Sequence, residues 1–284
     1  KEIKDLDLRR KINLLIALIF STISCFSQTE SKKNKKGDIS FLWGWNRDWY
    51  SSSDINFIGP DYNFKLSNVS AKDNQTKFNP AIYFHPKWIT IPQTNCRIGY
   101  FITNNYELSV GLDHMKYVVQ QDQNVHISGE INILEDLRYN GIFNNDELEL
   151  NYDFEKKNGF LAFEHTDGLN YINIEYKRYD NILTYKKNFI SFSEGIGIGV
   201  LVPKTNVRLL GHKRYDQFNL AGFGFNSVFG IKLNFKRFFI QSEIKGGFIN
   251  MPNIRTTLNI EDKAMQYFFF LQTNLLLGLT FKLD

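Results

Sequence analysis

The side chains with the greatest capacity for chemistry form a charged group that includes one histidine. The group comes from three segments of the chain: Asp113, Glu164, His165, Asp167, Glu175 and Lys177. A histidine beside carboxylates can bind a cation or, next to a nucleophile, act as a general base in ester hydrolysis. Ser109 and Ser191 are the nearest candidate nucleophiles by strand parity.

The same residues also fit a structural role. Glu175 and Lys177 stand two positions apart, as do Glu243 and Lys245, so each pair lies on one face of a strand. Small barrels fill their interior with side chains, and charged ones must be paired there. The Asp-Gly pair at Asp167 is an ordinary turn sequence. We therefore predict a charge cluster in a barrel lumen, with no catalytic residue and no metal ligand, and keep the cation site and the hydrolase as alternatives.

Several other chemistries lack their sequence patterns. The chain has no Gly-rich phosphate loop between a strand and a helix, no histidine pair at the helical zinc spacing, and only two cysteines, Cys25 and Cys96. His114 falls on an outward strand parity, which suits an interface better than a site. The net charge of +4 is too balanced for a nucleic-acid partner. We expect no cofactor and no nucleic acid.

The element that best reveals how such residues are positioned is the C-terminal stretch, 265–284. Its alternate residues from Leu271 to Phe281 are apolar except for Thr273, and the residues between them are mostly polar or small. This period of two indicates a strand. The stretch is longer than the roughly 5–6 residues of a common strand, and it matches the roughly 9–11 residues of a transmembrane strand.

The same period recurs along the chain. Hairpins are predicted from 97–103 to 106–118 around Asn104-Asn105, from 148–154 to 160–164, and from 218–235 to 238–248. Further strands are predicted at 39–46, 55–69, 126–134, 169–178 and 191–200. Residues 71–95 contain three prolines and are predicted to form a long connection folded into the lumen. The fold class is therefore all-β: an antiparallel up-and-down transmembrane β-barrel of about 12 strands, with 10 as the alternative.

The N-terminus has the pattern of a secretory signal, in which basic residues 9–11 precede an apolar core at 12–20. We predict a signal peptide region at 1–28, a polar linker at 29–37 and an outer-membrane β-barrel at 38–284. A mean hydropathy of −0.32 is compatible with this barrel, since lipid-facing and lumen-facing residues alternate and average out.

Four strings carry a resemblance to a known group of proteins: Thr90-Ile91-Pro92-Gln93, Arg97-Ile98-Gly99-Tyr100-Phe101-Ile102, Asp113-His114-Met115-Lys116-Tyr117 and Glu164-His165-Thr166-Asp167-Gly168-Leu169-Asn170-Tyr171. With these strings and the C-terminal hairpins, residues 38–284 resemble uncharacterised outer-membrane β-barrel proteins of Gram-negative bacteria, of the Bacteroidetes type. The resemblance implies a fold and a location in the bacterial outer membrane, and it supplies no functional residue.

Three functions are compatible with this barrel. The first is a structural or partner-binding protein without catalytic activity, whose loops 119–147 and 201–217 contact other proteins. The second is a narrow pore for solutes. The third is a membrane-embedded hydrolase of lipid or lipopolysaccharide that uses His165. We expect the first, with outer-membrane lipid and lipopolysaccharide as the surrounding partners.

Overall fold

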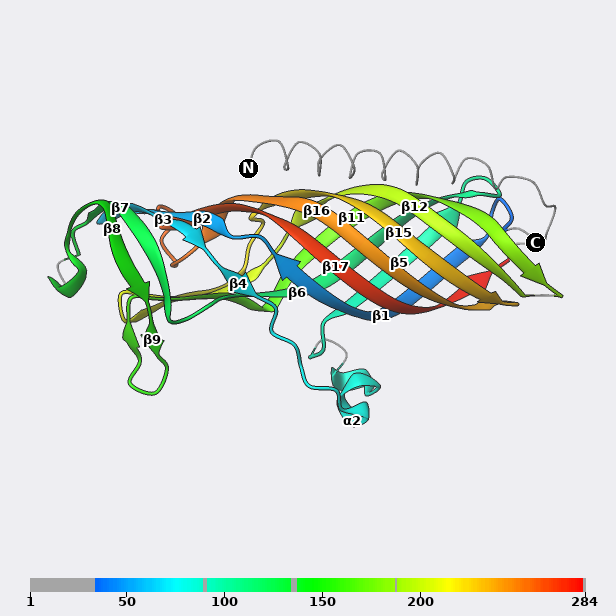
Figure 1. Cartoon of the computed structure of the whole chain (residues 1–284), viewed down its shortest axis with the longest axis horizontal. Helices are drawn as coiled ribbons and strands as arrows, with labels where there is room; N and C mark the ends of the chain where they lie inside the picture. Colours follow the sequence, from blue (N-terminus) through cyan, green and yellow to red (C-terminus); the bar gives the residue numbers. More distant parts are fainter. Residues whose placement is uncertain (1–33, 89–90, 134–136, 187, 283–284) are drawn as a thin grey trace, which may run out of the picture.

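The computed structural model describes residues 34–88, 91–133, 137–186 and 188–282. The predicted signal region 1–28 lies outside the described residues, and of the predicted linker only 34–37 lie within them. Most of the described chain is antiparallel β-sheet, arranged as an elongated body with a barrel at one end (Figure 1).

Within the described residues, eight strands pair in a closed ring. In ring order they are β1 (Ile39–Tyr50), β5 (Thr94–Phe101), β6 (Tyr106–Val119), β11 (Leu161–Tyr185), β12 (Asn188–Leu201), β15 (Gly222–Phe235), β16 (Phe238–Arg255) and β17 (Lys263–Phe281). The register of β1 against β17 runs from Ile39↔Phe281 to Tyr50↔Phe270 and closes the ring. Ring neighbours follow one another along the chain, so the barrel is of the up-and-down type.

The ring of eight corrects the predicted barrel of about twelve strands. The remaining strands of the described chain are β2 (Ser53–Gly59), β3 (Tyr62–Val69), β4 (Ala71–Lys72), β7 (Gln123–Ile131), β8 (Gly141–Leu150), β9 (Tyr152–Asp153), β10 (Asn158–Gly159), β13 (Lys204–Leu209) and β14 (His212–Phe218). They belong to an extension beyond one end of the barrel (Figure 1). A period of two identifies a half-buried strand, but it does not say which structure buries it.

The extension consists of two sheet layers that enclose an apolar core. In one layer, the first residues of β17 pair with β2, and β3, β7 and β8 follow in order. In the other layer, β6 and β11 continue out of the barrel and β13 and β14 extend the sheet. Aromatic rings meet between the layers, with centroids 5.9 Å apart for Phe57 and Phe163 and 5.0 Å apart for Tyr117 and Phe268.

Two predictions for the C-terminal part of the chain are confirmed: the hairpin that turns at Lys236 and Arg237, and the alternation of outward and inward residues on the last strand. The hairpin from β15 to β16 turns at Lys236 and Arg237, with Lys236 at φ 61°. On β17, Leu275 and Leu279 point outward and Gly278 points into the lumen, where an added Cβ would collide with the ring of Phe239. The hairpin from β5 to β6 is also confirmed.

The predicted hairpin between 148–154 and 160–164 is wrong. Leu148 and Leu150 belong to β8, which pairs with β7. Residues 154–157 instead form the turn of a ribbon of two residues a side, β9 and β10, with Lys157 at φ 54°. The turn chemistry was recognised, but the flanking strands pair with partners more distant in the sequence.

The predicted turn at 164–168 is also wrong, because β11 runs through it as one strand of 25 residues. The pairing of β11 with β6 shifts between His165 and Leu169, which makes the stretch a bulge. Gly168 has φ +121°, a conformation that a glycine adopts without strain. An Asp-Gly pair serves a bulge as well as a turn.

Residues 71–95 are not folded into the lumen as one segment, although Gln93 and Asn95 near their end donate there to Asp48 and Gln272. After β4, they leave the wall as a side arm with the short helix α2 (Pro80–Tyr83) and the 3-10 turn η1 (Pro86–Trp88); a second 3-10 turn, η2 (Leu137–Tyr139), lies in the extension (Figure 1). Asn79 caps α2 by accepting a hydrogen bond from the Ala81 amide at 2.9 Å. The ring of Phe84 packs on the outward-facing Trp45 with centroids 5.3 Å apart.

Candidate functional site

Both faces of the long strands change character at the boundary between the barrel and the extension. On β6 the inward face is polar from Glu107 to Asp113 and becomes apolar at Met115. The outward face is apolar and exposed at Val110 and Leu112, and the next residue on that face is His114. Polar residues are therefore inside and apolar residues outside in the barrel, and the arrangement is reversed in the extension.

The closing strand β17 shows the same reversal. Its inward side chains are Phe268 and Phe270 in the extension and then Gln272 and Asn274 in the barrel. Because strand parity does not change along the regular part of β17, the environment on each side of the strand must change instead.

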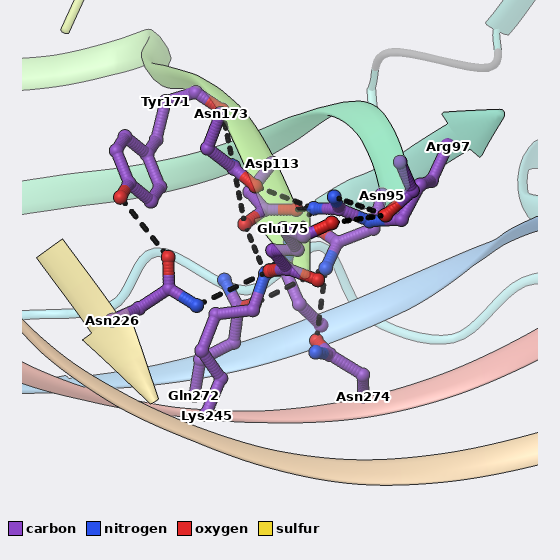
Figure 2. A network of polar contacts seen from close by, with 12 residues as sticks. Asn95, Arg97, Asp113, Tyr171, Asn173, Glu175, Asn226, Lys245, Gln272 and Asn274 are labelled. Atoms are coloured by element: carbon purple, nitrogen blue, oxygen red, sulfur yellow. Dashed lines mark hydrogen bonds and ion pairs between the residues drawn. The ribbon is translucent and has the colours of Figure 1, made fainter. Parts of the chain in front are cut away.

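The lumen holds a charge network centred on Glu175, which is fully buried. Its carboxylate lies 3.1 Å from the guanidinium of Arg97, 3.0 Å from the ammonium of Lys177 and 2.8 Å from that of Lys245 (Figure 2). Arg97 comes from β5, Lys177 from β11 itself and Lys245 from β16 on the far wall. Glu175 therefore joins opposite walls of the barrel.

Two further carboxylates complete the network. Asp113 accepts from Lys245 at 2.5 Å and from the Asn173 amide at 3.1 Å, and Glu243 accepts from Lys177 at 2.5 Å. Three cations thus face three anions, with side chains at most 4 % exposed. Equal and opposite charges in contact avoid the high cost of an unpaired buried ion.

Amide side chains fill the lumen between this network and the extension. Asn95 donates to Gln272 and Asn274, each at 3.1 Å (Figure 2). Gln272 and Gln93 donate to the two oxygens of Asp48 at 3.0 and 2.8 Å. Toward the other end of the barrel, the lumen holds a small cluster of buried apolar side chains: Leu42, Phe239 and Leu276.

Of the six residues predicted to cluster, the structure brings together three: Asp113, Glu175 and Lys177. Glu164 instead faces outward, half-buried, and accepts from Asn206 at 2.8 Å. Partial burial raises its pKa above the usual range. Asp167 is exposed in the bulge and forms an ion pair with Lys204 at 2.6 Å. The prediction placed Glu164 inward because it assumed that a turn follows it.

His165 lies in the apolar core of the extension. Its Nδ1 is 2.9 Å from the Thr205 hydroxyl, and its ring contacts those of Phe163 and Tyr117. Burial lowers its pKa from 6.5 to about 3. A neutral imidazole that is sealed among aromatic rings cannot receive substrate.

The two candidate serine nucleophiles lie elsewhere. Ser109 donates to the Glu175 carbonyl at 3.3 Å, and Ser191 donates to Asn181 at 2.7 Å, both on the lumen side. The predicted alternative of a hydrolase built on His165 therefore lacks its geometry. Within the described residues, no three His, Cys, Asp or Glu side chains gather as a metal site would require.

No family model and no curated protein matches this chain. Among solved structures, the outer membrane protein AlkL, in a solid-state NMR structure in DMPC bilayers, is similar at TM-score 0.40 and 10 % identity over 90 % of this chain and 96 % of that one. The outer membrane protein OprG of Pseudomonas aeruginosa is similar at TM-score 0.37 and 8 % identity, over 89 % of this chain and 100 % of that one. Neisserial surface protein A is similar at TM-score 0.36 and 9 % identity, over 86 % of this chain and 99 % of that one. Likenesses this weak add nothing to what the strand pairings establish.

Arg97 and the amide side chains are members of the lumen network that were not predicted. The available signal was their parity, because Asn95 and Arg97 alternate with the outward-facing Cys96 and Ile98. What the sequence could not supply was the partner of Arg97, since Glu175 lies 78 positions further along the chain. Among the described residues, no helix has the length and hydropathy of a membrane span.

Proposed function

We propose that this chain is an outer-membrane β-barrel protein of a Gram-negative bacterium, of the Bacteroidetes-type group that it resembles, and that it has no catalytic activity. Its eight ring strands cross the membrane, and its extension stands outside the cell as a structural or partner-binding body. The observation that carries the proposal is the reversal of polarity at the boundary, because only an apolar surrounding favours an apolar outside and a charged inside.

The outward side chains of the ring form a continuous apolar band. The exposed members include Ile98, Val110, Ile174, Ile196, Phe225, Ile231, Ile244 and Leu275. Soluble monomers rarely expose apolar patches larger than a few hundred Å². Tyr100, Tyr176, Phe235 and Phe281 lie on the same face toward one end of the barrel, and Trp49, Tyr267 and Phe269 lie toward the other. Aromatic girdles of this kind mark the two edges of a membrane band.

The connections favour one orientation. The ring strands β5–β6, β11–β12 and β15–β16 are joined by turns of two to four residues at the end where Ile39 and Phe281 pair. The connections at the other end include the whole extension. Short periplasmic turns and long extracellular loops are the rule for bacterial barrels, so the extension faces the exterior.

The filled lumen favours a structural or partner-binding role over a narrow pore. The charge network and the amide side chains join opposite walls, and the cluster around Leu42 adds apolar side chains toward the end where Ile39 and Phe281 pair. The predicted partner segments 119–147 and 201–217 are built largely of strands rather than loops, mainly β7, β8, β13 and β14. These strands are the surface that we assign to protein partners.

The test is made on the protein expressed with its leader in a Gram-negative host. We expect it in the outer-membrane fraction, with different gel mobility before and after boiling, because a closed barrel survives detergent. Recovery as a soluble periplasmic protein would refute the membrane placement. We expect no steady single-channel conductance in planar bilayers. Such conductance would show that the protein is a pore and would contradict the structural role.

A further inference from the structure

A cavity of about 610 Å³ opens on the outer surface where the barrel meets the extension. It lies beside the bulge in β11, where the pairing of that strand with β6 shifts between Leu169↔Met115 and His165↔Tyr117. Ile91 from the side arm and Phe218 from the end of β14 also contribute to its walls. The cavity is thus enclosed by three separate parts of the chain and opens toward the apolar band.

The cavity is apolar at the barrel end and basic at the extension end. Leu112 and Ile172 are outward residues of the band, with 39 % and 43 % of their surface exposed. His114 and Lys116 follow Leu112 on the same face of β6 and are only 7 % and 9 % exposed. Two steps along one strand face, about 13 Å from Leu112 to Lys116, therefore lead from an apolar floor to an ammonium group.

The carboxylates of Asp73 and Asp167 lie close enough to attract the ammonium of Lys116, but neither forms an ion pair with it. It donates to the Ile91 carbonyl at 2.8 Å and, at 3.5 Å, to the Thr76 hydroxyl, and in the described part of the chain it has no ion-pair partner within 4.0 Å. Asp167, at the rim of the cavity, is itself paired with Lys204 at 2.6 Å. A cation that is nine-tenths buried and makes no direct ion pair gains from contact with an anion from outside.

The side arm places the cavity at the edge of the lipid layer. Phe78, Phe84 and Trp88 of the arm are exposed by 68, 58 and 45 % beside the apolar band, where Phe84 packs on Trp45. Such aromatic side chains belong at a membrane–water interface. Through Ile91 the arm forms one wall of the cavity, so the cavity lies beside these aromatic side chains.

We propose that this cavity binds one phosphate-bearing lipid of the membrane, with an acyl chain against Leu112 and Ile172 and the phosphate beside Lys116 and His114. Asn170 Oδ1 lies 2.8 Å from His114 Nδ1 and holds the imidazole on this face. The ligand class follows from the order of the two surfaces along the cavity. An acyl chain joined to a phosphate matches an apolar end followed by a basic end. The inference rests on the proposed membrane placement.

The experiment measures lipid retention by the purified, delipidated protein in detergent, using native mass spectrometry. The probes are dioleoylphosphatidylglycerol and dioleoylglycerol, which share their acyl chains and differ in the phosphate-containing headgroup. We expect one tightly held phospholipid and little retention of dioleoylglycerol. Lys116→Gln keeps a donor for the Ile91 carbonyl but removes the charge, and we expect about a tenfold loss of phospholipid affinity, the size of one charge-assisted contact.

Two controls make the result specific. Lys65→Gln removes an exposed lysine of the extension and should leave retention unchanged. Ile172→Thr alters the floor while keeping a β-branched side chain, and it should weaken phospholipid binding even if Lys116→Gln fails to fold. Equal retention by wild type, Lys116→Gln and Ile172→Thr overturns the site. Displacement of the lipid by inorganic phosphate alone also overturns it, in favour of a plain anion site.

The outcomes separate this inference from the proposed function. Heat-dependent gel mobility and outer-membrane fractionation are measured on the same wild-type preparation. If both hold while Lys116→Gln binds lipid as wild type does, the lipid site is wrong and the membrane placement stands. If the wild type is recovered soluble, the placement itself has failed.

Discussion

The lumen of the barrel and the core of the extension are built from the same strands, yet they are filled by opposite chemistry. Around Glu175, buried charges pair across the lumen. Around Phe163, aromatic and aliphatic side chains exclude water as in an ordinary globular core. The difference shows that the burial pattern of a strand is set by what lies outside it. Where the surroundings are apolar, the polar side chains lie inside. Where the surroundings are aqueous, the apolar side chains lie inside.

Breaking the lumen network should have the largest effect. Glu175→Gln leaves Arg97, Lys177 and Lys245 with too few carboxylates, and an uncompensated buried charge costs about 3–5 kcal/mol. The free energy of unfolding, measured by urea titration in lipid vesicles, should fall by this amount. Glu149→Gln, on the exposed edge strand β8, is the matched control. Equal stability of the two variants would mean that the network is hydrated and weak.

A cavity in the extension should be comparably costly but should spare the barrel. Phe163 is 1 % exposed and packs on Phe57, and a buried Phe→Ala change costs about 3–5 kcal/mol. Phe163→Ala should therefore expose the extension to limited proteolysis while the barrel keeps its heat-dependent mobility. Phe154→Ala, at an exposed position, should do neither. Loss of the barrel together with the extension would show that the two cores unfold as one unit.

A charge on the outer face of the barrel tests the apolar exterior directly. Leu275 lies midway along the outward apolar run from Phe269 to Phe281, and an arginine on the lipid face at the midplane costs about 2–4 kcal/mol. Tyr267→Arg, on the same face of the same strand but at the upper edge, should cost at most about 1 kcal/mol. Folding yield into vesicles measures both, and an equal penalty at the two positions would contradict a membrane band.

Acid should weaken the extension through His165. Its pKa is about 3 in the fold against 6.5 in a model peptide, so below pH 6.5 the unfolded chain binds the proton that the folded chain does not. Above pH 6.5 the imidazole is neutral in both states and adds no pH dependence. Stability should fall by about 1.4 kcal/mol per pH unit from pH 6.5 toward pH 3. In His165→Phe this slope should be absent, and an unchanged slope would assign it to other groups.

The smallest effect is expected from an exposed ion pair. Lys65 and Asp54 lie 3.3 Å apart on the surface of the extension, with side chains 45 % and 38 % exposed. Water and salt screen such a pair, so Asp54→Asn should change stability by less than about 1 kcal/mol. A loss as large as that of Glu175→Gln would remove the distinction between the two regions.

The sequence predicted local features well and distant ones poorly. Alternation placed Leu275 outside and Gly278 inside, and the turn at Lys236 is where two patterned runs meet. Strand parity also placed Asp113 and Glu175 together in the lumen. Parity failed at Glu164, because a bulge and a turn share the same Asp-Gly signal. It also could not assign strands to the barrel or to the extension, since both produce the same period of two.

The continuity of β11 has a mechanical consequence. This strand of 25 residues runs from the barrel into the extension, and the segment from Leu161 to Leu169 spans about 26 Å at the rise of an extended chain. Its neighbour β6 also crosses the boundary, as do β16 and β17 elsewhere in the ring, so the extension is joined to the barrel rigidly and not through a flexible linker. A partner that pulls on the tip of the extension applies a shear force to the hydrogen bonds of the barrel wall. The partner also binds at a fixed height above the lipid.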